Sequence, residues 1–215
     1  MLVACWSVKG GVGTSVVAAS LALLLARRAR SGVVLADLAG DVPAVLGVPE
    51  PESPGLAGWL AAGDDVPADG LARLEVGVVP HLVLLPRGAG PLPPARAPVL
   101  ATLLDRGPRP AVVDCGLAEP AAGAVVGAAQ RSILVTRPCF LALRRAKASP
   151  LRPSEVIVVR EPGRALGRHD IEEAVEAPVR AEIEADPAVA RAVDSGLLAA
   201  RRLPRSLERG LRHAA

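Results

Sequence analysis

Short apolar runs alternate with longer helix-like stretches along most of the chain. Seven runs rich in Val, Leu and Ile, each bounded by Gly, Pro or charged residues, predict buried β-strands. Most of the segments between them fit helices. The predicted strands are 2–8, 33–37, 82–85, 111–114, 132–136, 155–160 and 179–183, and the predicted helices are 15–30, 97–105, 119–129, 139–148, 168–176 and 187–199.

This alternation indicates a fold of the α/β class. Strands that are apolar on both sides belong to a sheet covered on both faces, and strand–helix–strand repeats make neighbouring strands parallel. We therefore expect a doubly wound, mostly parallel sheet with helices on both faces. In such a fold, ligands bind at the carboxyl ends of the strands.

The stretch 48–80 departs from this rhythm and is rich in proline, and a second Pro/Gly cluster follows at 86–98. We expect mobile or interface-forming loops there rather than a domain boundary. Within the stretch, Leu56, Trp59 and Leu60 are spaced like one face of a helix, for which core packing and a partner contact are both open interpretations.

Composition narrows the class of protein further. The chain has 215 residues and is 51% apolar, but its aromatic residues are few, so Ala, Val and Leu must form the core. The longest apolar helical stretch, 16–26, is well short of the roughly 20 residues that a membrane span needs. The first apolar segment also lacks the basic lead of a signal peptide. We expect a cytoplasmic protein.

The three cysteines do not suggest a metal centre. Cys5, Cys115 and Cys139 lie in or next to predicted core strands and lack the short spacing of metal ligands. Buried free thiols are the expected state.

The most informative segment lies directly behind the first apolar run, where three glycines precede an apolar helix. Glycine permits backbone conformations that turn N–H groups inward, and a helix N-terminus adds about half a positive charge. The segment therefore predicts a phosphate-binding loop. Its residues are Lys9, Gly10, Gly11, Val12, Gly13, Thr14 and Ser15.

Two other interpretations of this loop stay open. A plain turn between strand and helix needs one glycine, not three beside a lysine. A dinucleotide-binding loop would place a small residue at Val16, although Asp37 lies at a suitable distance along the chain for a ribose contact. Lys9 and Lys147 are the only lysines in an arginine-rich chain, so composition alone would place an arginine at position 9. A lysine beside three glycines therefore favours the phosphate interpretation.

Residues 9–15 resemble the deviant phosphate loop of the MinD/ParA family of dimerising ATPases, Lys-Gly-Gly-x-Gly-Lys-Thr/Ser, at every position except Thr14. The form with threonine there is similar to the branch that includes the CpaE and TadZ pilus-positioning proteins and their actinobacterial septum-site relatives. The resemblance implies ATP or ADP with Mg²⁺ as cofactors. It also implies a homodimer in which Lys9 reaches the partner's nucleotide and serves catalysis.

The apolar strand that ends at Asp114 has the form of a Walker B element. There Asp114 would support Mg²⁺ through water, together with the hydroxyl of Ser15. The other interpretation of Asp114 is a cap for the following helix.

The second predicted strand ends at Asp37, which the resemblance places near Mg²⁺ and the loop lysine. The family's water-positioning aspartate falls on Ala39. Asp41 could take that catalytic role if the backbone bends, but its position before a proline favours a helix N-cap.

The strand 155–160 resembles the family's late strand that ends in Asn-Arg, which makes Arg160 a candidate nucleotide contact. The asparagine that reads adenine falls on Val159. A lost charge-assisted phosphate contact costs roughly 1.5–3 kcal/mol, which millimolar ATP can offset. Each lost group that stabilises the transition state lowers the rate of hydrolysis about 10²-fold. We therefore expect nucleotide binding with weak or no hydrolysis.

Residues 1–200 are therefore expected to form the nucleotide-binding domain and 201–215 a basic amphipathic tail. In the tail Leu203, Leu207 and Leu211 share one helix face opposite the arginines. Packing on the parent domain, docking to a partner protein and contact with the inner membrane surface are the three interpretations. Nucleic-acid binding is disfavoured, because the tail lacks aromatic residues.

The resemblance implies a positioning or scaffolding protein for a cell-envelope machine such as a Tad-type pilus or the division septum. Its partners would be pilus-assembly or division proteins. Two alternatives remain, a slow ATPase that depends on dimerisation and an interaction module that binds no nucleotide.

Overall fold

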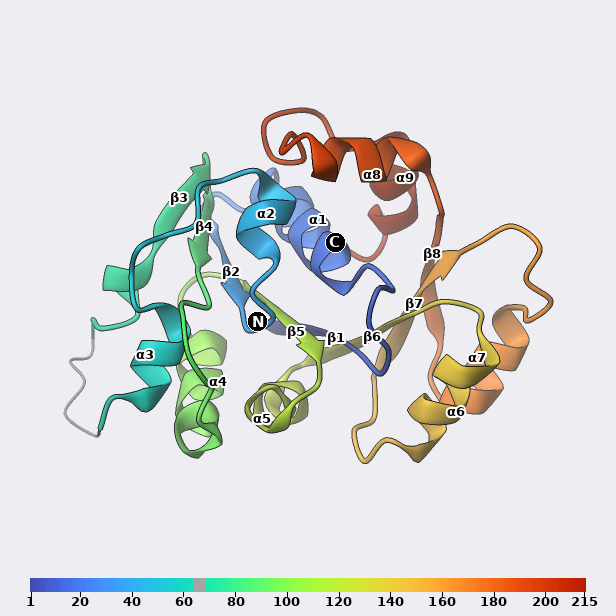
Figure 1. The fold of residues 1–215 in the computed structure, drawn as a ribbon, viewed down its shortest axis with the longest axis horizontal. Coiled ribbons are helices and arrows are strands. Elements are labelled where there is room, and N and C mark those ends of the chain that lie inside the picture. Colours follow the sequence, from blue (N-terminus) through green and yellow to red (C-terminus); the bar gives the residue numbers. More distant parts are fainter. Residues whose placement is uncertain (64–68) are drawn as a thin grey trace.

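The computed structural model describes residues 1–63 and 69–215, and its centre is one eight-stranded sheet (Figure 1). The strand order is β3-β4-β2-β5-β1-β6-β7-β8; β3 runs antiparallel to β4 and the other pairs are parallel. This confirms the doubly wound α/β fold. The strands are β1 (Leu2–Ser7), β2 (Val33–Asp37), β3 (Val76–Val79), β4 (Leu82–Leu85), β5 (Ala111–Leu117), β6 (Arg131–Thr136), β7 (Glu155–Arg160) and β8 (Val179–Glu184).

Helices cover both faces of this sheet (Figure 1). One face is covered by α1, α2, α8 and α9, and the other by α3 to α7. Successive strand residues point to opposite faces, so each apolar strand contributes to both cores. The helices are α1 (Thr14–Ala26), α2 (Val42–Leu46), α3 (Gly55–Ala61), α4 (Ala97–Arg106), α5 (Pro120–Ala128), α6 (Phe140–Ala148), α7 (Arg168–Val175), α8 (Pro187–Asp194) and α9 (Arg205–Leu211).

The stretch 48–80 is more regular than its composition predicts, since it contains α3, a single 3₁₀ turn at Ala72–Leu74 and β3. Residues 64–68 of the predicted loop lie outside the described residues. The side chains of Leu56, Trp59 and Leu60 are buried, which confirms core packing for this cluster. The sequence missed β3 because it is a short, half-exposed edge strand.

Two helices end earlier than the sequence predicts. The first helix ends at Ala26 instead of residue 30, where a turn leads through Gly32 into β2. The helix predicted for 187–199 ends at Asp194, and Gly196 follows with a positive φ of 64°. Gly196, directly after the C-cap residue of α8, ends a helix that the apolar pattern alone would continue.

The leucine face of the C-terminal segment packs on the domain. Leu203, Leu207 and Leu211 are at most 3% exposed and join the core formed by α1 and β8. Arg27 pairs with Glu208 at 3.3 Å on the rim of this contact. The structure thus supports the first of the three interpretations of the tail. In the described part of the chain, every helix is too short or too polar to cross a bilayer.

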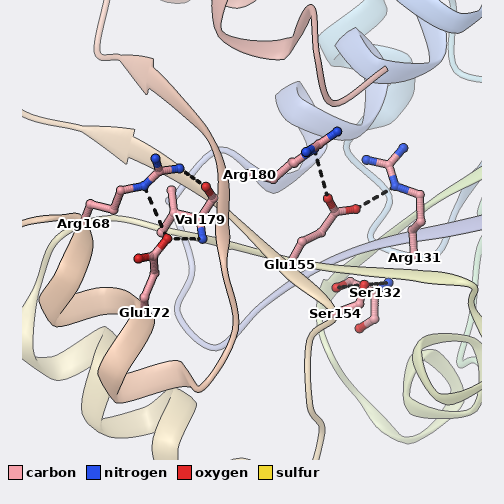
Figure 2. Close-up of polar contacts among 8 residues, drawn as sticks. All are labelled: Arg131, Ser132, Ser154, Glu155, Arg168, Glu172, Val179 and Arg180. Atoms are coloured by element: carbon pink, nitrogen blue, oxygen red, sulfur yellow. Dashed lines mark hydrogen bonds and ion pairs between the residues drawn. The ribbon is translucent and has the colours of Figure 1, made fainter.

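A polar cluster lies at the amino-terminal ends of β6, β7 and β8 (Figure 2). Glu155 is only 8% exposed, and its two oxygens face Arg131 at 2.6 Å and Arg180 at 4.0 Å. A buried carboxylate needs such partners, because burial penalises its charge. This cluster lies at the opposite end of the sheet from the glycine loop.

Candidate functional site

The glycine loop joins β1 to α1 as an open cradle. Gly11 and Gly13 have φ values of 72° and 96°, which other residues rarely adopt, and Gly13 occupies the N-cap position of α1. The positions where Cβ atoms of Gly10 and Gly11 would stand are open. The first turn of α1 carries no acidic side chain. Its N–H groups are therefore available to an anion.

A cleft of about 560 Å³ opens above this loop at the carboxyl ends of the strands. The phosphate-loop residues Gly10, Gly11, Gly13, Thr14 and Ser15 all contribute to its lining. The other walls come from the loops after β2 and β4 and from the end of β5 with the loop that follows it, which supply Leu38, Ala39, Asp41, Arg87, Cys115, Gly116, Leu117 and Glu119. The topology thus brings distant parts of the chain to one edge, as expected for a doubly wound sheet.

Asp37 is fully buried at the end of β2, and its carboxylate holds its own loop in place. It accepts hydrogen bonds from the N–H groups of Ala39 at 2.9 Å, Gly40 at 2.6 Å and Val42 at 3.1 Å. Burial nevertheless raises the pKa of Asp37 to about 6. Because its oxygens already hold three donors, the structure favours a loop-shaping role over direct contact with a metal.

Asp114 lies beside Asp37, since β2 and β5 pair in register at these residues. Its Oδ1 accepts from Gly116 N–H at 3.1 Å, whereas its buried Oδ2 has no partner in the described part of the chain. Burial raises the pKa of Asp114 to about 7, and the neighbouring Ser15 side chain opposes the shift.

These groups fit a Mg²⁺ ion held partly through water. Magnesium prefers oxygen ligands and keeps several waters when it binds beside phosphates. The Ser15 hydroxyl and the free oxygen of Asp114 supply such ligands next to the cradle. When bound, the ion would neutralise phosphate charge there. The described residues contain no cluster of three His, Cys, Asp or Glu side chains that could hold a metal unaided.

The structure brings some predicted site residues together and separates others. Asp41 is exposed on the cleft wall; it occupies the N-cap position of α2, but its side chain makes no capping bond, and Asp37 accepts from Val42 instead. Arg160 lines neither this cleft nor the cavity beside it and pairs with Glu182 at 2.9 Å.

Lys9 is half-buried on the β6 side of the loop and does not line the cleft. Its charge helps to lower the pKa of the Cys139 thiol, after the larger effect of the Ala142 N–H group. The cysteines are free, and Cys5 and Cys115 are buried as predicted, whereas Cys139 is partly exposed and corrects the expectation of a buried thiol there. Arg87 lines the cleft although no motif identified it.

A second cavity of about 420 Å³ adjoins the first and shares Gly13, Val16 and Val193 with it. Its wall is mainly aliphatic and includes Val12, Val17, Val159, Ile183 and Val189. An aliphatic cavity beside a phosphate cradle suits the flat ring of a base. Val159 offers that ring contact without a hydrogen bond.

The central β1–loop–α1 unit and the cleft at the carboxyl edge define an α/β phosphate-loop protein. The sequence of residues 3–199 matches the family model described as the CobQ/CobB/MinD/ParA nucleotide binding domain. The chain belongs to this family. A comparison with curated proteins finds no match.

Solved structures of this family share the fold at low sequence identity. A ParA family ATPase from Chlorobium tepidum has a TM-score of 0.81 and 23% identity, over 98% of this chain and 96% of that one. The septum site-determining protein MinD from Pyrococcus horikoshii, complexed with Mg-ADP, has a TM-score of 0.73 and 22% identity, over 92% and 87%. An ATP complex of McdA from Cyanothece has a TM-score of 0.75 and 19% identity, over 99% and 95%.

Proposed function

We propose that this protein binds ATP or ADP with Mg²⁺ in the cleft above the glycine loop. The observation that carries the proposal is the buried oxygen of Asp114, which has no partner among the described residues and lies close to Ser15 of the open glycine cradle. A site of this kind binds an anion and a hard cation together. The relatives whose structures contain Mg-ADP or ATP support the same ligand class.

We propose further that hydrolysis is weak or absent. Thr14 brings a hydroxyl to the position where the family's phosphate loops carry a lysine, and Ala39 has no group that could orient water. A Cβ added to Gly116 would lie 2.9 Å from the Cβ of Ala39, so the end of β5 approaches the loop after β2 closely at this point. Asp41 on the cleft wall is the remaining candidate for that catalytic role.

The biological role in this proposal is a positioning or scaffolding factor of the CpaE/TadZ or septum-site type. It would act as a homodimer, with Lys9 reaching the partner's nucleotide. The leucines of the 201–215 tail are buried, so its exposed arginines would contact pilus-assembly or division proteins or the inner membrane surface. The support for this role is family membership and the loop sequence.

Two measurements on the purified protein test the proposal. Equilibrium binding of labelled ATP with and without Mg²⁺ is expected to show saturable binding that Mg²⁺ strengthens. Phosphate release is expected to stay well below about 1 s⁻¹, the lower end of ordinary turnover. Turnover at that rate or faster would favour the ATPase alternative, and absence of binding would favour a nucleotide-free interaction module.

A further inference from the structure

Arg87 is the one basic side chain among the described residues that line the cleft. The other charged residues in the lining are Asp41 and Glu119, and Asp37 and Asp114 are buried beneath it. A nucleotide would therefore bring its phosphates into surroundings that are otherwise acidic. A positive charge in the cleft would stabilise the bound phosphates, because exclusion of water strengthens charge–charge contacts.

The backbone of Arg87 is fixed by α3. The N–H of Leu56 donates to the carbonyl of Pro86, and the N–H of Ala57 donates to the carbonyl of Arg87, both at 2.8 Å. Gly88 crosses the start of α3 so closely that any Cβ there would collide with the carbonyl oxygen of Pro54. This crossing requires glycine and fixes the direction in which the Arg87 side chain leaves the backbone.

The helix that holds Arg87 is itself anchored. Arg96 donates to the carbonyls of Trp59 at 2.7 Å and Ala62 at 2.8 Å, which lie at the C-terminal end of α3. Its guanidinium carbon lies 4.2 Å from the centre of the Trp59 ring, within the range of a cation–π contact. The apolar side of α3 is buried. The segment is therefore built as a rigid support.

The Arg87 side chain is half-buried and lies over the loop after β2. Its Cδ is 3.1 Å from the place where a Cβ of Gly40 would stand, so the side chain packs closely against this loop. Its Nη1 donates to the carbonyl of Gly88 at 3.2 Å.

The strand order shows which end of a nucleotide would meet Arg87. Along the carboxyl edge, the aliphatic cavity lies at β7 and β8, the glycine loop at β1, Asp114 at β5 and Arg87 after β4. A nucleotide with its base in that cavity and its phosphates on the loop extends its last phosphate toward β5, β2 and β4. The adenosine end lies on the opposite side of the loop.

We propose that Arg87 binds the terminal phosphate of ATP and makes the site prefer ATP to ADP. From the loop after β4, it would supply the positive charge that is missing at Thr14, where the family's loops carry a lysine. The inference rests on the proposed nucleotide binding and adds a selectivity to it. A guanidinium is suited to this task because it makes paired hydrogen bonds with phosphate oxygens.

The test compares the dissociation constants of Mg-ATP and Mg-ADP for the wild-type chain and for Arg87→Gln. Loss of one charge-assisted contact is expected to weaken ATP binding roughly tenfold to a hundredfold and to change ADP binding less than about twofold. Arg87→Lys is expected to recover part of the ATP affinity. Arg30→Gln, at an exposed arginine on the opposite edge of the sheet, is the matched control and should change neither constant.

Three results would overturn the inference. Unchanged ATP affinity in a folded Arg87→Gln protein would show that the side chain does not reach the nucleotide. An equal loss for ATP and ADP would place it at an inner phosphate. Either result would leave the proposed function standing, whereas a wild-type chain that binds neither nucleotide would overturn both. Circular dichroism of each variant checks that it is folded.

Discussion

Asp37, at the end of β2, and Asp114, within the neighbouring β5, are equally hidden from water, but their oxygens have different partners. Three backbone N–H groups occupy the carboxylate of Asp37, whereas one oxygen of Asp114 is free of protein donors in the described residues. From sequence, both residues are aspartates at the ends of predicted strands, and both are expected near Mg²⁺. The distinction comes from the bend of the loop after Asp37, which only the structure shows.

The raised pKa of Asp114, about 7 against an ordinary 3.8, predicts a pH-dependent cost in stability. The folded state holds this proton more tightly than the unfolded state does, so stability falls as pH rises from about 4 to about 7 and then levels off. Asp114→Asn removes the buried charge. In magnesium-free buffer the variant should be more stable than the wild type at pH 8, by an amount on the order of a few kcal/mol.

The difference in the free energy of unfolding between the two proteins should be smaller at pH 5, where the wild-type Asp114 carboxyl is mostly protonated. Urea unfolding at both pH values measures this difference. A difference that does not change with pH would contradict the raised pKa of Asp114.

Lys9 is the second residue with a specific expected effect. Lys9→Ala is expected to weaken ATP binding at least tenfold, because Thr14 contributes only a hydroxyl and the loop N–H groups carry the rest. Lys147→Ala removes the other lysine of the chain, which is exposed on α6, and serves as the control in the same titration. Equal affinity for the two variants would show that the loop does not use Lys9.

At the scale of elements, the sequence predicted most of the architecture. The strands at 33–37, 82–85 and 155–160 have the predicted bounds, because continuous Val and Leu runs between glycines and charges have few other stable arrangements. The sequence did not predict α3 or β3. Their helix and strand patterns are short and interrupted by proline and glycine, and contacts with distant segments stabilise them, such as those of Arg96 with α3.

The polar cluster at the amino edge gives a prediction at this scale. Arg131→Gln leaves the carboxylate of Glu155 buried without its close partner and should lower the free energy of unfolding by roughly 3–5 kcal/mol. Arg180→Gln, which removes the looser and more exposed partner at 4.0 Å, should cost less than about 1 kcal/mol. Urea denaturation of the two variants compares them, and similar losses would mean that the two contacts are equivalent.

At the scale of the whole molecule, nucleotide binding and assembly are expected to be linked. If Lys9 reaches a partner's phosphates, its charge is satisfied only in a dimer, so ATP binds the dimer more tightly and promotes dimerisation by the same factor. Sedimentation across protein concentration, with and without Mg-ATP, should show a mass that rises with nucleotide in the wild type and not in Lys9→Ala. A monomer at saturating ATP would exclude this arrangement.

The sequence by itself determined the fold class, the position of the glycine loop and the family, because these depend on residues that are adjacent along the chain. A strand, a glycine turn and a helix start form one local unit whose backbone conformations glycine permits. The tertiary structure decided which distant side chains join that unit. Only the pairing of β4, β2, β5 and β1 brings Arg87 to the cleft, and only the packing of α9 buries the leucines of the tail. These contacts join segments far apart in sequence, and the strand order that sets them is fixed by the packing of the whole core.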